Sequence, residues 1–334
     1  MTLSYTPRSR GTRWPALAFA AVAVGLVATA CGDSTTTGGQ AASTPGARTA
    51  LRVAYVPATT VLPLHVAKAQ GFFEKNNLDV TLTEAANISD IPATLGRQYD
   101  IALGTATDLI RAGAAGVDVV QVSGNTVSTK ANPFVKLIVK PDSGITDVAG
   151  LKGKKVGTPT LSGVIHAAVK YSAKQSGVDP SAIDGVEAPT PTLPDQLKAG
   201  RIDAVEALEP IASQLIKAGN VSIGAPFDAI ADPLATNFYV AQGSWATKNR
   251  DAVARFVEAL KQGQAFIESN PVEARKILQD YTKLPEPVAA TVPLPTFDFD
   301  VRTGDLDTWV KVLKDIGEFS GQVDTKKLVL SPGK

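Results

Sequence analysis

Hydrophobic and polar side chains alternate over residues 51–57, which is typical of a half-buried strand that ends at Pro57. A loop follows, then a helical pattern over residues 64–73 that stops near Gly71, and then a second alternating stretch over residues 78–82. Strand, loop, helix and strand within about thirty residues predict a βαβ unit, the beginning of a parallel sheet. Ligands of such sheets bind beyond the carboxyl ends of the strands. The residues predicted to lie there are Ala58, Thr59 and Thr60.

The chain continues with two matching series of predicted strands and helices. Strands are predicted at residues 99–104, 117–124, 134–140, 154–157, 183–188 and 201–208. Helices are predicted at residues 89–98, 105–116, 164–175, 193–200 and 209–219. In each series a Gly-Arg pair, Gly96-Arg97 or Gly200-Arg201, introduces a strand. Such joints are common in any α/β protein, but as whole units the two series favour two similar lobes that face each other across a cleft.

The C-terminal third of the chain is mainly helical. Residues 237–242 have the pattern of one more strand, and helices are predicted over residues 251–268, 271–281 and 306–319. Four prolines from Pro285 to Pro295 exclude a long helix in that stretch. Because these helices have no sheet of their own, we expect them to pack on the two lobes.

The first thirty residues have the layout of a secretory signal: three arginines, an apolar stretch over residues 16–27, and small residues before Cys31. Cys31 is the single cysteine of the chain, and its position resembles that of the acylated residue in the bacterial lipoprotein box. The alternative is an ordinary signal peptide cut near Ala30 beside an incidental cysteine. Ser, Thr, Gly, Ala and Pro dominate the next stretch, so residues 31–49 are predicted to tether a lipid anchor to the folded body.

Charge and motifs narrow the possible chemistry. Loss of residues 1–30 would remove three arginines and leave 30 basic against 32 acidic side chains, a net charge of about −2. This balance does not favour a nucleic-acid partner. The sequence contains neither a Gly-x-Ser-x-Gly elbow nor a Walker A motif, and two histidines are too few for a histidine-rich metal site. We therefore expect no cofactor and no metal.

Small and hydroxylic residues recur in the loops that follow predicted strands. They are Thr59, Thr60, Gly104, Thr105, Thr107, Asn125, Thr158, Thr160 and Ser162. Their hydroxyl groups, together with the free N–H groups at the starts of the following helices, are predicted to converge on one ligand. The alternative for any single member of this set is a helix cap.

A few further side chains are candidates for ligand contact. Glu206 is predicted to accept a hydrogen bond from a ligand amine or ring N–H, whereas Glu209, beside a proline, also suits the first turn of a helix. His65 and Phe238 are candidates whose alternative is ordinary packing. Asn237, which precedes Phe238 in the last predicted strand, is also predicted to contact the ligand.

Four segments resemble the substrate-binding proteins of ABC importers, in the branch that binds sulfonates, taurine, nitrate and pyrimidine precursors. The segments are LPLHVAKAQGFFEKNNLDVTL, YDIALG, LKGKKVGTP and AGRIDAVEALEP. The resemblance implies a two-lobed, type II periplasmic-binding-protein fold of the α/β class, each lobe a mostly parallel sheet flanked by helices, with the ligand cleft between the lobes. It implies that residues 50–136 and 240–334 form lobe 1 and residues 137–239 form lobe 2. The hinge would then lie at two chain crossings, near residues 137–140 and 236–239.

For function, the resemblance implies a lipid-anchored, extracytoplasmic monomer. It would capture a small organic or anionic solute by lobe closure and deliver it to an ABC permease with its ATPase subunits. The loop from Thr158 to Gly163 lacks the longer Ser/Thr/His run of sulfonate binders, and the acids Glu206 and Asp108 favour a neutral or amine-bearing heterocycle. The superfamily includes fungal pyrimidine-synthesising enzymes with a cysteine-rich motif that is missing here, so we expect no enzymatic activity. The alternatives are a secreted enzyme or a ligand sensor on the same scaffold.

Overall fold

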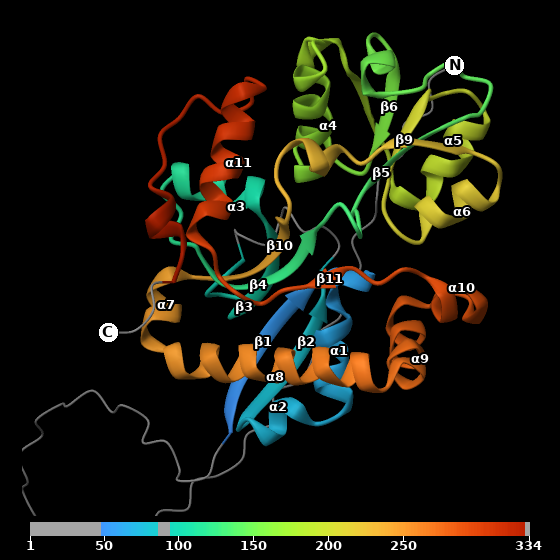
Figure 1. Cartoon of the computed structure of the whole chain (residues 1–334). Helices are drawn as coiled ribbons and strands as arrows, with labels where there is room; N and C mark the ends of the chain where they lie inside the picture. The colour runs from blue at the N-terminus through green and yellow to red at the C-terminus, as the bar shows by residue number, and fades with distance from the viewer. Residues whose placement is uncertain (1–47, 86–93, 331–334) are drawn as a thin grey trace, which may run out of the picture. The chain divides into compact units, whose positions relative to one another are not determined.

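Two β-sheets with helices around them organise the folded part of the chain (Figure 1). The computed structural model describes residues 48–85 and 94–330. The predicted signal sequence, Cys31, most of the predicted tether and the start of the helix predicted over residues 89–98 lie outside these ranges. Within the described ranges, no helix has both the length and the apolar character that a membrane span requires.

The first sheet is built from both ends of the folded chain. Its strands are Thr49–Tyr55 (β1), Leu78–Glu84 (β2), Ile101–Thr105 (β3), Val120–Ser128 (β4), Leu234–Ala241 (β10) and Thr296–Phe297 (β11). Their order across the sheet is β11-β4-β10-β3-β1-β2. β1 pairs in parallel with β2 and β3, as the βαβ pattern predicts, whereas β10 lies antiparallel between β3 and β4.

The second sheet repeats this plan with shorter strands. They are Lys136–Val139 (β5), Lys155–Thr158 (β6), Asp184–Glu187 (β7), Ala204–Ala207 (β8) and Val221–Gly224 (β9), in the order β7-β6-β8-β5-β9. β6 pairs in parallel with β7 and β8, and β5 lies antiparallel between β8 and β9. Each sheet therefore combines parallel pairs with an inserted antiparallel strand, β10 in the first and β5 in the second.

Helices cover both faces of both sheets. The α-helices are Leu62–Ala69 (α1), Phe72–Lys75 (α2), Ala106–Ala114 (α3), Val164–Gln175 (α4), Leu193–Lys198 (α5), Ile211–Lys217 (α6), Gly243–Lys248 (α7), Arg250–Ser269 (α8), Pro271–Thr282 (α9), Glu286–Thr291 (α10) and Thr303–Asp315 (α11). Two 3-10 helices matter below, Thr59–Val61 (η1) and Pro226–Ala229 (η6). α4 coincides with its predicted range, and Gly71, with a left-handed φ of 68°, separates α1 from α2.

Alternation along the strands decides which helices each face contacts. In β1, Val53 and Tyr55 belong to the apolar cluster formed with α1, α2 and α8, while Ala54 belongs to the cluster on the other face with α3 and α11. In the second sheet, Val156 packs with α4 and Val205 packs with α5 and α6. The helical tail thus packs on the sheets, as predicted.

The two Gly-Arg joints of the sequence form the same structure in both sheets. In the first, the backbone N–H of Arg52 donates to the Asp100 carboxylate at 2.8 Å, and the N–H of Asp100 donates to the Arg52 carbonyl at 2.9 Å. In the second, Lys155 and Asp203 make the same reciprocal pair, at 2.8 and 2.7 Å. In each pair, the two residues are 48 positions apart in the sequence. The Gly-Arg pattern that recurs in the sequence therefore precedes the same pair of hydrogen bonds between neighbouring strands in both sheets.

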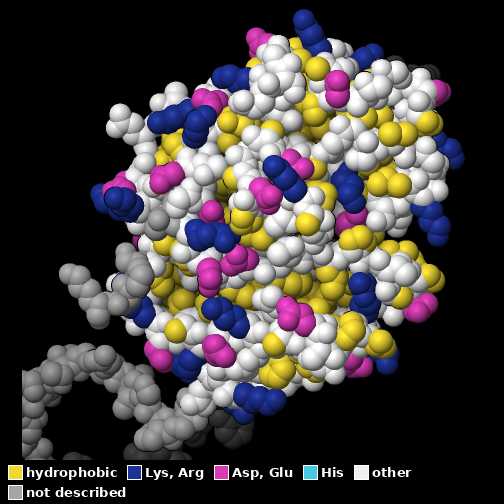
Figure 2. Space-filling view, in the orientation of Figure 1, with side chains coloured by type: hydrophobic (Ala, Val, Ile, Leu, Met, Phe, Trp, Pro, Cys, Tyr) yellow, Lys and Arg dark blue, Asp and Glu magenta, His cyan; other side chains and the backbone are white. Residues whose placement is uncertain are grey.

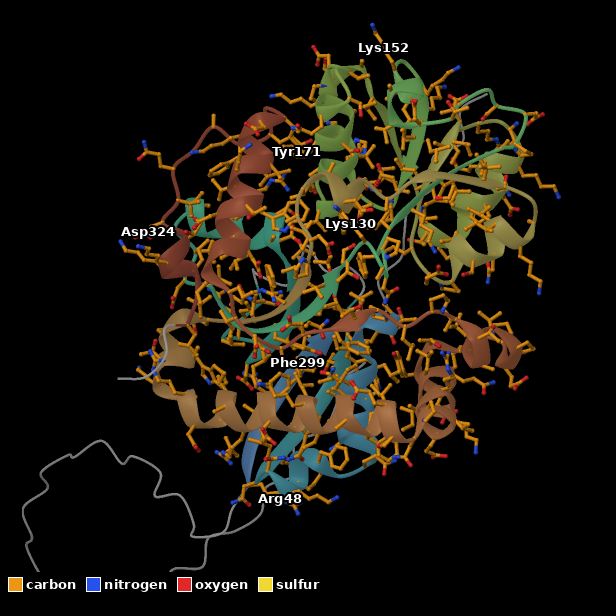
Figure 3. All side chains as sticks on the ribbon, in the orientation of Figure 1. Arg48, Lys130, Lys152, Tyr171, Phe299 and Asp324 are labelled. Carbon is orange, nitrogen blue, oxygen red and sulfur yellow. The ribbon has the colours of Figure 1, made fainter. Side chains whose placement is uncertain are left out.

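One apolar cluster reaches from the first sheet to α4, which flanks the second. Trp309 of α11 packs there with Tyr171 of α4 and Phe227 of η6; Tyr171 is labelled between α4 and α11 in Figure 3. At the rim, the Glu318 carboxylate pairs with Arg111 of α3 at 3.2 Å and with Lys170 of α4 at 3.0 Å. Apolar packing and ion pairs thus join the flanks of the two sheets.

The outer surface carries mixed charge. Figure 2 shows basic and acidic side chains interspersed over the face that it presents, with hydrophobic side chains between them. Together, the two helix-flanked sheets confirm the predicted α/β fold class. The sequence did not predict β9, α7 or α10, which are four, six and six residues long.

Candidate functional site

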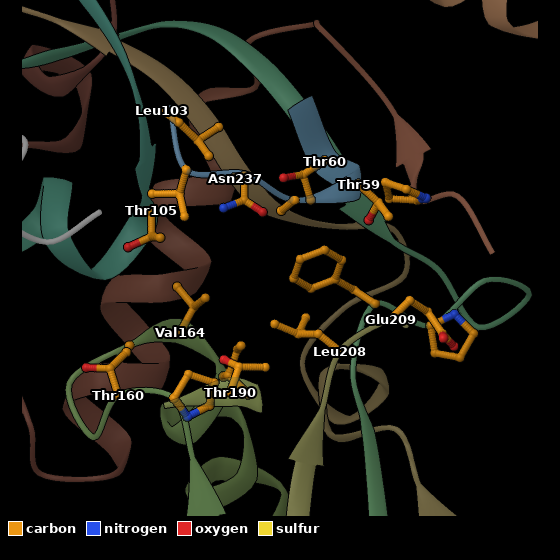
Figure 4. Close-up of a pocket in the computed structure, with 18 of the residues that line it drawn as sticks. Thr59, Thr60, Leu103, Thr105, Thr160, Val164, Thr190, Leu208, Glu209 and Asn237 are labelled. Carbon is orange, nitrogen blue, oxygen red and sulfur yellow. The ribbon is translucent and has the colours of Figure 1, made fainter. Parts of the chain in front are cut away.

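A cavity of about 420 Å³ lies between the two sheets, at the carboxyl ends of their parallel strands (Figure 4). Residues that end or follow β1 and β3 form one side, and residues that end or follow β6, β7 and β8 form the other. The volume falls within the range of small-molecule sites, roughly 300–1,000 Å³. The polar lining residues are Thr59, Thr60, Thr105, Asp108, Asn132, Lys136, Thr160, Glu187, Thr190, Glu209 and Asn237.

The start of α3 contributes a preorganised pair of polar side chains. Thr105 ends β3 and caps α3: its hydroxyl accepts from the backbone N–H of Asp108 at 3.4 Å and donates to the Asp108 carboxylate at 2.7 Å. The Thr107 hydroxyl lies 3.1 Å from that of Thr105. Both Thr105 and Asp108 line the cavity. Capping and ligand contact are thus compatible roles for Thr105.

The second-sheet side holds two acids at fixed positions. Glu187, at the end of β7, accepts a hydrogen bond from the backbone N–H of Leu161 at 2.9 Å, which ties it to the loop before α4. Glu209 follows β8; one carboxylate oxygen pairs with Lys136 at 3.2 Å and the other accepts from the N–H of Ser213 in α6 at 3.1 Å. These contacts orient both carboxylates.

Asn237 enters from the returning strand β10. Its side-chain oxygen accepts from the Thr126 hydroxyl at 3.2 Å, and the same hydroxyl lies 2.7 Å from that of Thr236. All three side chains are buried, and Asn237 lines the cavity. This network fixes one end of the amide group.

Six of the predicted site residues are brought together at the cavity. They are Ala58, Thr59, Thr60, Thr105, Thr160 and Asn237. Glu209, for which a place in the first turn of a helix was the alternative, lines the cavity as well. All six lie at or just beyond the end of a strand, or in β10, which lies beside those strand ends. Ligand contact by these residues remains a prediction.

The other predicted site residues do not line the cavity. They are His65, Gly104, Thr107, Asn125, Thr158, Ser162, Glu206 and Phe238. Thr107, Asn125, Thr158 and Phe238 are completely buried, and Gly104 packs against Val240. The Ser162 carbonyl accepts from the Arg111 guanidinium.

Glu206 and His65 have partners in the interior. Glu206 is still inside β8, and its carboxylate lies 2.6 Å from Nδ1 of His166, with both side chains almost fully buried. His65 stacks on Tyr281, and burial lowers the pKa of His65 to about 4. Each of the two side chains therefore has a described partner away from the cavity.

Sequence reasoning missed the apolar lining and several polar positions. The apolar members include Val56, Leu103, Val127, Pro133, Phe134, Pro159, Val164, Ile165, Pro189, Leu208, Pro293, Leu294 and Pro295. Glu187 is the last residue of β7 and Thr190 follows the strand predicted over residues 183–188, so the strand-end rule that selected Thr160 also points to Thr190. Residues Pro293 to Pro295 belong to the helical tail, and no local sequence pattern predicts that they line the cavity.

The lining is net acidic. Among the described residues that line the cavity, three are carboxylates and one, Lys136, is an amine that already pairs with Glu209. Carboxylates in a partly enclosed site favour ligand amines and cations and disfavour anions. Within the described residues, no group of three or more His, Cys, Asp or Glu side chains is placed to hold a metal ion.

Solved structures share this fold. The periplasmic aliphatic sulphonate binding protein SsuA of Escherichia coli matches 85% of this chain and 93% of its own with a TM-score of 0.73 and 21% identity. The alkanesulfonate-binding protein SsuA of Xanthomonas axonopodis, solved with MOPS, gives a TM-score of 0.69 at 18% identity over 84% of this chain and 97% of its own. The nitrate-binding protein NrtA of Synechocystis gives 0.68 at 16% identity over 84% of each chain. The predicted two-lobed binding-protein fold is confirmed.

Sequence relatives correct one expectation. A 4-amino-5-hydroxymethyl-2-methylpyrimidine phosphate synthase of Saccharomyces cerevisiae is 27% identical over 234 residues, which cover 66% of this chain and 67% of the relative. A synthase of the same name from Candida albicans is also 27% identical, over 64% of this chain and 65% of its own. Because these relatives are named as enzymes, the expectation that the chain has no enzymatic activity is contradicted. The missing cysteine-rich motif was too narrow a criterion.

The match to a family model is continuous across both sheets. Residues 58–274 match the model described as NMT1/THI5 like, a range that runs from the loop after β1 into α9. It includes the strand ends that form the cavity on the first and second sheets. The predicted resemblance is confirmed, and the chain belongs to the NMT1/THI5-like family.

Proposed function

We propose that this chain captures a small, amine-bearing aromatic solute in the cavity between its sheets and delivers it to the permease of an ABC importer. The observation that carries the proposal is the cavity itself: loops from both sheets converge on it, and its polar lining is net acidic. The solute-binding neighbours that share the fold, and the family membership, support a binding role.

The ligand class follows from the charges at the cavity. Asp108 sits in the first turn of α3, where a sulfonate would otherwise meet the positive end of the helix dipole. A carboxylate at that position repels an anion and accepts a hydrogen bond from an amine or ring N–H. Phe134 adds an aromatic ring to the lining. The relatives named as aminopyrimidine phosphate synthases also support a nitrogen heterocycle.

Closure of two lobes on the ligand is part of the proposal. We assign residues 50–136 and 240–334 to lobe 1, residues 137–239 to lobe 2, and the hinge to crossings near residues 137–140 and 236–239. Support comes from β5 and β10, the inserted antiparallel strands, which lie at these crossings. A hinge of two strands permits rotation of one sheet against the other.

The location of the chain is a further part of the proposal. Neighbours described as periplasmic support an extracytoplasmic site of action. A lipid on Cys31 would hold the chain at the membrane beside a permease and its ATPase subunits, as a monomer. Labelling of cells with radioactive palmitate tests the anchor: wild type should be labelled and a Cys31→Ser variant should not, and equal labelling of the two would contradict it.

Calorimetric titration of a defined panel tests the binding proposal. The probes are 4-amino-5-hydroxymethyl-2-methylpyrimidine, its phosphate, MOPS and nitrate. We expect the unphosphorylated pyrimidine to bind with a Kd of about 1 μM or below and the anions to bind at least about tenfold more weakly. Preferential binding of MOPS or nitrate would contradict the assigned ligand class.

A second candidate function is a reaction on a bound pyrimidine, which the names of the relatives favour. Mass spectrometry of the small molecules in the same titration mixtures separates the two candidates. Release of the pyrimidine unchanged after prolonged incubation supports delivery, whereas the appearance of a new pyrimidine product supports catalysis.

A further inference from the structure

Three aromatic rings lie directly behind the part of the cavity wall that follows β1. The ring of His65, on α1, stacks on that of Tyr281, on α9, with centroids 3.7 Å apart and an angle of 6° between the planes. Tyr55, the last residue of β1, makes a T-shaped contact with His65, with centroids 4.6 Å apart and an angle of 83° between the planes. None of these three residues lines the cavity.

The Tyr281 hydroxyl reaches the backbone of the wall. It donates a hydrogen bond to the Ala58 carbonyl at 2.8 Å. Asn125, from β4, donates to the Thr60 carbonyl at 3.1 Å, so the same short segment is held from two directions. Both carbonyls belong to residues that line the cavity, and so does Thr59 between them.

The segment itself is a short turn that leads directly into α1. Ala58 precedes η1 with extended backbone angles, φ −157° and ψ 166°, and has no side-chain cap. η1 itself is a single 3-10 turn of three residues. Within the turn, the Val61 N–H donates to the Ala58 carbonyl at 3.3 Å and the Leu62 N–H donates to the Thr59 carbonyl. The described side-chain hydrogen bonds to the carbonyls of residues 58–60 are those from Tyr281 and Asn125, so these two tie the turn to the rest of the fold.

The stacked pair of Tyr281 and His65 keeps one protonation state over a wide pH range. Burial raises the pKa of the Tyr281 hydroxyl well above its ordinary value, so the hydroxyl retains the proton that it donates. Burial lowers the pKa of His65 to about 4, so the stacked imidazole is neutral near pH 7. Apolar contacts of α9, through Ala274 and Leu278, with Leu62 and Val66 of α1 place the two rings against each other.

We propose that Tyr281 is a positioning residue for ligand binding: its hydroxyl, held in place by the stack with His65, sets the conformation of residues 58–60. This inference rests on the proposed function, because it assigns a role in recognition to a side chain that touches no ligand. It makes α9, on the outer side of the first sheet, part of the recognition machinery.

The substitution Tyr281→Phe tests the inference because it removes the hydroxyl and keeps the ring. Hydrogen–deuterium exchange of the unliganded protein is measured over residues 56–62, and the Kd for 4-amino-5-hydroxymethyl-2-methylpyrimidine is measured by calorimetry. Loss of one hydrogen bond predicts about fivefold faster exchange in this segment and about fivefold weaker binding, with exchange elsewhere in the first sheet unchanged.

A matched control is Thr282→Val, which removes a hydroxyl from the neighbouring residue of α9. The hydrogen bonds of that hydroxyl among the described residues stay within or just beyond its own helix: it donates to the Leu278 carbonyl and accepts from the N–H of Leu284. The control should leave residues 56–62 and the Kd unchanged. Unaltered exchange in Tyr281→Phe, or the same change in the control, would overturn the inference. Failure of wild type to bind the pyrimidine would count against the proposed function, and the exchange result alone would then decide the role of Tyr281.

Discussion

The substitution Asp108→Asn tests the assigned ligand class at one atom. In wild type the Thr105 hydroxyl donates to the Asp108 carboxylate at 2.7 Å. The asparagine side chain has the same size and keeps an oxygen that can accept this hydrogen bond, but it removes the negative charge from the cavity. A hydrogen bond to a charged group contributes about 1.5–3 kcal/mol and a neutral one about 1 kcal/mol. The variant should therefore bind 4-amino-5-hydroxymethyl-2-methylpyrimidine more weakly by about 1–2 kcal/mol, or roughly 5–30-fold.

The same change should have the opposite effect on an anion. A unit charge about 6 Å from a sulfonate repels it by about 3 kcal/mol at an effective dielectric constant of about 20, so MOPS should bind more tightly to the variant. Calorimetry at one salt concentration measures both constants. The control is Asp79→Asn, an exposed carboxylate near the start of β2, at the opposite strand end from the cavity. Equal affinities of wild type and Asp108→Asn for both probes would refute the reasoning from charge.

Three further predictions concern the framework. Glu318→Gln weakens the ion pairs that join α3 and α4, and urea unfolding should show a loss of about 0.5–1 kcal/mol; an unchanged midpoint would show that the pairs contribute nothing. Burial gives His65 a pKa of about 4 in the folded protein against about 6.5 in the unfolded chain, so its contribution to the free energy of unfolding falls as the pH drops from 6.5 to 4. Over this range wild type should lose up to about 3 kcal/mol more stability than His65→Phe. Parallel losses in the two proteins would contradict a buried neutral imidazole. Gly263→Ala places a Cβ 2.5 Å from a backbone oxygen of α1, so calorimetric melting should show a loss of about 1–3 kcal/mol instead of the usual gain for alanine in a helix.

Much of the fold was predictable because a long helix or strand repeats its hydrophobic spacing often enough to be recognised from the sequence. The twelve residues of α4 repeat at helical spacing and end before Gly177, so its bounds coincide with the prediction. β9, α7 and α10 are too short to show a period, and α10 forms among prolines because Pro287 occupies a position in its first turn, where a missing N–H costs nothing.

The site was predictable as far as strand ends determine it. Thr60 and Thr160 lie beyond strands and reach the cavity, whereas Glu206 is one residue inside the end of β8 and turns into the interior toward His166. A strand end placed one or two residues too early therefore assigns a core side chain to the ligand. The wall from Pro293 to Pro295 depends on how the tail packs, which is a tertiary fact without a local pattern.

Native mass spectrometry of the folded protein tests most directly whether the cavity holds a small molecule. Wild type and Val164→Trp, which puts a large ring where a buried lining residue stands, are compared after incubation with 4-amino-5-hydroxymethyl-2-methylpyrimidine, with circular dichroism to verify that both are folded. We predict one bound molecule per wild-type chain and none on the folded variant. Equal occupancy of the two proteins, or an empty wild type, would contradict a ligand site between the sheets.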